Sequence, residues 1–95
     1  MITNCIAKED IPQYTFIRED VLRHDFAGQQ SRRLSLLRAQ QLGNGFQGKV
    51  RISFTTSEAD SCQVETTVWQ TSDEYVSLKG GIMLPVRAIN RVEFA

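Results

Sequence analysis

The chain has 95 residues, of which 41% are hydrophobic, and this suffices for one modest core but not for two independent domains. Eleven basic and eleven acidic side chains give a formal net charge of zero, which excludes long-range attraction to a polyanion as a property of the whole molecule. We therefore expect a single domain over residues 1–95.

The N-terminal segment and the cysteines indicate a cytoplasmic location. The segment has acidic residues early and lacks the apolar region of a signal peptide. No apolar run approaches the roughly 18 residues of a membrane span, so we expect no membrane contact. Two cysteines, Cys5 and Cys62, are too few for a disulfide-stapled scaffold, and we expect both to be reduced.

Charge is segregated along the chain. Residues 23–51 carry six basic side chains and one acidic side chain, whereas residues 52–78 carry five acidic side chains and no basic one. The two segments either attract each other within the fold or present opposite faces to partners.

The N-terminal part is predicted to be an arm followed by a helix. Residues 1–30 show no sustained hydrophobic period, and Pro12 disfavours helix at the residue before it, so we expect an extended arm. Residues 31–43 are predicted to form a helix, because they are rich in Leu, Arg, Ala and Gln. Ser31 suits its N-cap, and Gly43 is placed to end it.

The apolar face of this helix is unusually wide. At about 100° per residue, Leu34, Leu37 and Leu42 fall on one arc, and Leu36 and Ala39 lie to the side of it. The more common explanation is a broad stripe that faces the core. A helix lodged between the domain and a second surface, such as another subunit, has the same pattern.

After Gly48 the hydrophobic period changes to two, which predicts β-structure over residues 49–95. Gly80 and Gly81 supply the positive φ angles of a tight two-residue hairpin. Pro85 indicates a sheet edge or a strand end, and residues 87–90 have the length of one helical turn. The predicted strands are residues 49–55, 62–70, 75–79, 82–86 and 91–94.

Five short strands with a helical turn before the last are what a small, strongly bent barrel requires. The expected fold class is mainly β with one N-terminal α-helix, in an α+β arrangement whose residues 49–95 form a five-stranded antiparallel barrel. This order of elements resembles the Sm-like and Src-homology-3-like small barrels, and a preceding helix is the Sm arrangement in particular.

Four short segments carry a family resemblance: LLRAQ at residues 36–40, LGN at 42–44, TTVW at 66–69 and LKGG at 78–81. In these segments the chain resembles an uncharacterised family of short bacterial proteins. Because that family has no assigned activity, the resemblance implies a compact stand-alone protein and no site. The Asp-x-apolar-Met-Asn and Arg-Gly motifs of Sm proteins are absent, so Sm-type RNA recognition is not implied.

Few side chains suit catalysis or metal binding. His24 is the single histidine, and Asp25 beside it suggests an oriented general base. Neighbours along a chain usually point apart, however, and no nucleophile is identifiable nearby. One histidine and two distant cysteines do not have the spacing of a zinc site. We expect no enzyme activity, no cofactor and no metal.

The basic segment offers a candidate binding surface. Arg32 and Arg33 lie at the start of the predicted helix, where the macrodipole disfavours positive charge. Carboxylates from the acidic strands or the phosphates of a nucleic acid could offset this cost, and an internally paired face is the more common case. The candidate surface consists of Arg32, Arg33, Arg38, Lys49, Arg51, Trp69 and Tyr75.

Two functions remain open from the sequence. The first is a non-catalytic binding module whose helix and edge strands engage a protein partner or another copy of the chain. The alternative is a small barrel that binds nucleic acid through the basic side chains, with the two aromatic residues stacking on bases.

Overall fold

A computed structural model of the chain describes residues 4–46 and 48–94. Within these ranges it confirms the α+β class, with one long α-helix, two short 3₁₀ helices and seven strands. The first three residues of the predicted arm and the last residue of the predicted barrel segment lie outside the described residues. In chain order the elements are β1 Asn4–Cys5, η1 Lys8–Gln13, α1 Phe26–Phe46, β2 Val50–Thr55, β3 Ser61–Thr66, β4 Val68–Thr71, β5 Tyr75–Leu78, β6 Ile82–Pro85, η2 Val86–Ala88 and β7 Ile89–Phe94.

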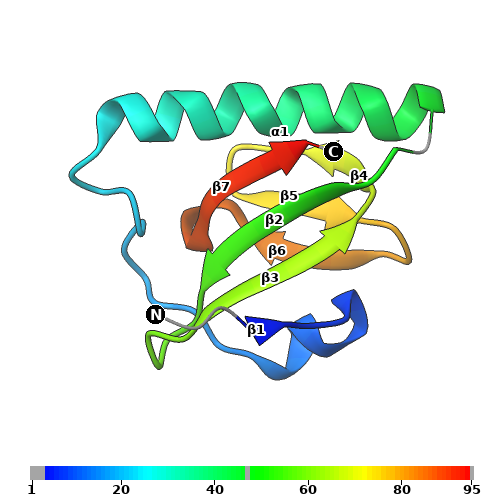
Figure 1. Cartoon of the computed structure of the whole chain (residues 1–95). Helices are drawn as coiled ribbons and strands as arrows, with labels where there is room; N and C mark the ends of the chain where they lie inside the picture. The colour runs from blue at the N-terminus through cyan, green and yellow to red at the C-terminus, as the bar shows by residue number, and fades with distance from the viewer. Residues whose placement is uncertain (1–3, 47, 95) are drawn as a thin grey trace.

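The strands form two open sheets (Figure 1), one in the order β1-β3-β2-β7 and the other in the order β4-β5-β6. The prediction of one strand over residues 62–70 is wrong, because the chain passes from the first sheet to the second at Thr67. Only that buried residue separates β3 from β4. The core lies between the sheets, where β2 buries Val50, Ile52 and Phe54 as its alternation predicts.

Helix α1 begins and ends outside the predicted range of 31–43. Asp25 is its N-cap, because its Oδ1 accepts a hydrogen bond of 2.8 Å from the Gly28 N–H. Ser31 is therefore an interior, exposed residue. Gly43 does not end the helix either: it is buried, and the helix continues past it for three residues.

The helix face that meets the core also differs from the arc of leucines. The buried positions are Arg32, Leu36, Ala39 and Gly43, whereas Leu34 is 67% exposed. The spacing of four, three and four residues keeps this buried stripe on one face. A hydrophobicity pattern does not detect this buried stripe, because the residues at its two ends are an arginine and a glycine.

The buried stripe holds α1 against edge strands of both sheets. On β4, Gln40 Oε1 accepts a hydrogen bond of 2.6 Å from the Thr71 N–H. On β7, Arg32 Nη1 donates to the carbonyl oxygen of Ile89 at 3.0 Å. In Figure 1 the helix accordingly lies along one side of the molecule, with both sheets beneath it. It thus covers edges that would otherwise be open to pairing with other chains.

The N-terminal arm is not simply extended. Asn4 and Cys5 pair in parallel with β3, and the chain then forms the 3₁₀ helix η1, which contains Pro12. The residue before this proline, Ile11, is only 1% exposed, so burial of its side chain outweighs the local preference for extended backbone. Farther on, Arg87 Nε donates to the carbonyl of Ile17 at 2.7 Å and ties the arm to η2.

The glycine hairpin is confirmed in its backbone but not in its length. Gly80 and Gly81 have φ angles of 90° and 82°, as predicted. Because Leu78 pairs with Ile82, the loop contains three residues rather than two. Pro85 ends β6, also as predicted, and the helical turn after it begins one residue earlier than expected.

Candidate functional site

Arg32 is not a surface residue, contrary to its place in the candidate binding surface. It is 6% exposed, and its guanidinium makes a two-pronged ion pair with Asp20, with N–O distances of 2.8 and 2.6 Å. The same side chain reaches Ile89 on β7. Arg32 therefore ties the arm, α1 and β7 together, and it is not available to a phosphate.

This ion pair changes the acidity of its carboxylate. The hydrogen bond from Arg32 lowers the pKa of Asp20 from its usual value of 3.8, and partial burial opposes this effect. Because the folded-state pKa is depressed, the stabilisation is fully present above the unfolded-state value and is lost as pH falls through the folded-state value.

We expect this titration to be visible in the pH dependence of stability. The free energy of unfolding of the wild type should fall as the pH drops below 3.8, the usual pKa of an aspartate. Urea denaturation between pH 7 and pH 2 measures this fall. In Asp20→Asn the fall should be smaller, since no carboxylate remains to be protonated at that position. Equal pH dependence in the two proteins would show that the pair is not formed in solution.

Arg33 is paired as well, but at the surface. Its Nη1 lies 2.6 Å from Oδ1 of Asp73, and the two side chains are 61% and 83% exposed. Arg51 lies 3.7 Å from Glu65 in a second exposed pair. Both pairs join the basic segment to the acidic segment, so the charge segregation is used in part within the fold. The helix dipole does not disfavour Arg33 as expected from the sequence. Helix α1 begins at Phe26, so Arg33 lies in its second turn, beyond the range of the dipole.

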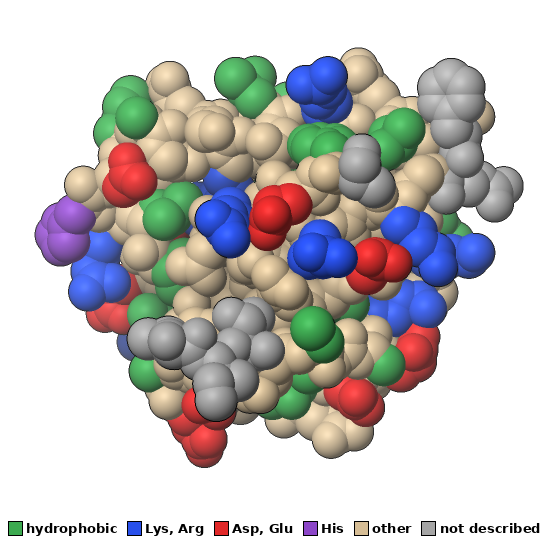
Figure 2. Space-filling model, in the orientation of Figure 1, with side chains coloured by type: hydrophobic (Ala, Val, Ile, Leu, Met, Phe, Trp, Pro, Cys, Tyr) green, Lys and Arg blue, Asp and Glu red, His purple; other side chains and the backbone are tan. Residues whose placement is uncertain are grey.

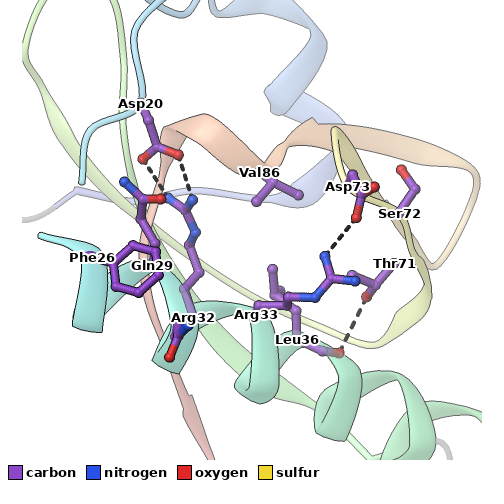
Figure 3. A pocket seen from close by; sticks show the side chains of 11 residues that line it. Asp20, Phe26, Gln29, Arg32, Arg33, Leu36, Thr71, Ser72, Asp73 and Val86 are labelled. Atoms are coloured by element: carbon purple, nitrogen blue, oxygen red, sulfur yellow. Dashed lines mark hydrogen bonds and ion pairs between the residues drawn. The ribbon is translucent and has the colours of Figure 1, made fainter. Parts of the chain in front are cut away.

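A cleft lies between the two helix-borne ion pairs. In Figure 3, Arg32 points toward Asp20 and Arg33 toward Asp73, with Val86 between them. The cleft has a volume of about 290 Å³. A second cavity of about 290 Å³ shares four of its lining residues and is also lined by Tyr75. The charged side chains of α1 that line this cleft, Arg32 and Arg33, are each paired with a carboxylate.

The structure does not bring Trp69 and Tyr75 together. Trp69 is 46% exposed and lines a separate cavity of about 260 Å³ with Gly43 and Lys79. Tyr75 has acidic neighbours, among them Glu74. The cavities that contain the two rings share no lining residue, so they form no common stacking surface for bases.

The remaining basic residues gather around Phe94. The guanidinium of Arg38 lies 5.5 Å from the centre of that ring, and Lys49 and Arg51 line a cavity of about 240 Å³ together with Phe94. Among the described residues, Arg38 and Lys49 have no carboxylate partner. Two glutamates, Glu65 and Glu93, line the same cavity, so this surface is only mildly basic.

The candidate binding surface predicted from the sequence leaves out a set of exposed apolar side chains on α1. Phe26, Leu34 and Leu37 are 73%, 67% and 39% exposed. Figure 2 shows hydrophobic side chains and a basic one along the upper rim of the molecule, where α1 runs in Figure 1. The signal was present in the unusual width of the apolar face, since only half of that face packs on the core.

The residues considered for chemistry are placed apart from one another. His24 is exposed in a turn, and Asp25 is engaged as the helix cap rather than in orienting an imidazole. Cys5 is exposed and Cys62 is buried, and both thiols are free, as predicted. Burial raises the pKa of the Cys62 thiol, and the negative charge of Asp60 adds a smaller effect in the same direction. Over residues 4–46 and 48–94, no three potential metal ligands come together.

No α-helix in the described ranges is both long and apolar enough to cross a membrane. Comparisons with protein-family models, with curated proteins and with solved structures find no match.

Proposed function

We propose that the chain is a non-catalytic binding module that associates with protein, and in the first place with other copies of itself. The observation that carries this proposal is the exposure of large apolar side chains on the outer face of α1, with Leu34 at 67% and Leu37 at 39%. Contiguous exposed apolar surface on a small protein is typical of an interaction site. Of the two arginines beside these leucines, Arg33 is paired with Asp73 and Arg38 lies over the ring of Phe94, which leaves apolar contact as the main source of affinity.

The architecture that fits this module is a small barrel of the Sm-like or Src-homology-3-like kind. Counting the bent pair β3 and β4 as one strand leaves five strands after α1, with η2 before the last of them. Pairing of β2 with both β3 and β7 supports this arrangement. We propose in addition that the chain belongs to the uncharacterised family of short bacterial proteins and that it is located in the cytoplasm.

Sedimentation equilibrium over a wide range of protein concentration tests self-association. The expected result is a mean mass that rises with concentration above that of the 10.8 kDa monomer. The rise should persist at high salt, because apolar association is not screened. A monomer at every concentration would exclude self-association and leave only binding to a different protein.

Nucleic-acid binding is the second candidate. It is favoured by Arg38 and Lys49 beside Phe94, which have no carboxylate partner in the part of the chain that the structure describes. Fluorescently labelled single-stranded DNA and RNA at low ionic strength provide the test. The surface has three cations, Arg38, Lys49 and Arg51. A plot of the logarithm of the association constant against the logarithm of the salt concentration should therefore have a slope of about −2. Replacing Lys49 with Glu should flatten that slope. If neither nucleic acid binds in a salt-sensitive way, this candidate is excluded.

A further inference from the structure

The face of α1 that points away from the sheets is a continuous exposed seam. In Figure 1 all other elements lie on the opposite side of the helix. The outward side chains repeat at alternating steps of three and four residues, which is the spacing of the contact positions between two packed helices. All six are exposed. They are Ala27, Gln30, Leu34, Leu37, Gln41 and Asn44.

The seam has nearly the same chemistry in both directions along the helix. Leu34 and Leu37 form its centre, with Gln30 four residues before the first leucine and Gln41 four residues after the second. A face with this symmetry is complementary to itself when a second copy is turned end to end about a two-fold axis.

We infer that a second copy of the chain docks on this seam, with the two α1 helices antiparallel. Leu34 packs against the partner's Leu37, and Gln30 lies beside the partner's Gln41, where the two amides can exchange hydrogen bonds. This inference rests on the proposed self-association and names the surface and geometry by which it occurs.

The charges beside the seam select the antiparallel orientation. In a parallel pair, the flanking positions would place Arg33 of each copy beside the partner's Arg38, and like charges repel. Turning one helix end to end instead places Arg33 beside the partner's Gln40 and Arg38 beside the partner's Ser31. Asp73 pairs with Arg33 and offsets part of this repulsion, but α1 itself contains no acidic residue and Arg38 has no carboxylate partner among the described residues.

The size of the seam indicates a weak dimer. With 21 residues, α1 is about 31 Å long. Two such helices side by side bury on the order of 700 Å² in total, which is below the roughly 1,200 Å² of a stable specific complex. We therefore expect a weak dimer, so the measurements must extend to the highest soluble protein concentration.

A pair of matched variants tests the seam. Leu34→Lys places a charge in its centre, and Met83→Lys makes the same kind of change at an apolar side chain on β6 that is 52% exposed. Because both side chains are exposed, both variants should fold, which thermal unfolding verifies. Sedimentation equilibrium should show at least a tenfold rise in the dimer dissociation constant for Leu34→Lys and less than a twofold change for Met83→Lys.

The outcomes separate the inference from the proposed function. If the wild type dimerises and Leu34→Lys dimerises equally well, the module self-associates through another surface and the inference is wrong. If the wild type is monomeric at every concentration, the proposed self-association fails and the inference fails with it. If Leu34→Lys loses the dimer and Met83→Lys keeps it, both the proposed self-association and its location at the seam are supported.

Cysteine cross-linking tests the orientation independently. The variants Gln30→Cys and Gln41→Cys are made in a Cys5→Ser background, because Cys5 is exposed while Cys62 is buried. In the antiparallel dimer, the two copies of residue 30 are about 16 Å apart along the helices, beyond the reach of a disulfide. Oxidation should cross-link a mixture of the two variants and neither variant alone. Efficient cross-linking of each variant alone would show a parallel pair and overturn the proposed geometry.

Discussion

Replacing Asp20 with Ala is expected to destabilise the fold by about 3 kcal/mol, because removing one partner of a buried ion pair leaves the other charge uncompensated. Arg32 is 6% exposed and has two hydrogen bonds to Asp20. Without them, the carbonyl of Ile89 is the one hydrogen-bond partner that residues 4–46 and 48–94 still give its guanidinium. Its Nε already has no partner among the described residues, so the loss cannot be compensated locally. Urea denaturation at pH 7 measures the change.

The exposed ion pair on the same helix provides the control. Asp73→Ala removes the partner of Arg33, but both of those side chains are well exposed, so we expect a loss of less than about 1 kcal/mol. The double variant Asp20→Ala with Arg32→Met should recover much of the stability, since no unpaired charge remains buried. An effect of Asp20→Ala as small as that of Asp73→Ala would contradict the role of Arg32 as a clamp.

Local patterns predicted β2, β5 and β6 to within one residue, because alternation is a property of neighbouring residues. The pattern Val50, Ile52, Phe54 places one face of β2 in the core without reference to the rest of the chain. The helix bounds were wrong for the opposite reason. Gly43 is buried because β4 approaches the helix there, and that approach comes from a segment about 25 residues farther along the chain. Helix propensity alone predicts that such a glycine ends the helix.

The candidate site shows the same division between local and distant information. Charge segregation indicated that the two segments attract, but not that Arg33 would meet Asp73 or that Arg32 would turn inward to Asp20. Those pairings depend on how the arm wraps around the sheets. The exposed leucines were within reach of the sequence, because Leu34 and Leu37 lie on the opposite side of the helix from Leu36 and Ala39.

Replacing Gly43 with Ala is expected to destabilise the protein by about 2 kcal/mol, although the same change usually stabilises a helix. A Cβ at this position would overlap the carbonyl oxygen of Val68 and come within 2.8 Å of Cγ2 of Thr67. A backbone carbonyl in β4 cannot rotate away as a side chain can. The helix must therefore move off β4, and the hydrogen bond from the Thr71 N–H to Gln40 lengthens.

Gly45→Ala is the matched control, because it makes the same substitution in the same helix, two residues later. Nothing lies within 4 Å of a Cβ at Gly45, so only the helix propensity changes. Because Gly45 is one residue from the end of α1, we expect a gain smaller than the roughly 1 kcal/mol of an interior position. Opposite signs for the two variants in thermal and urea unfolding would establish that close approach to β4 fixes the position of α1. If Gly43→Ala also stabilised the protein, the helix would have room to move. The outward seam would then not be held in one place, and a dimer that depends on its position would be weaker than the buried area suggests.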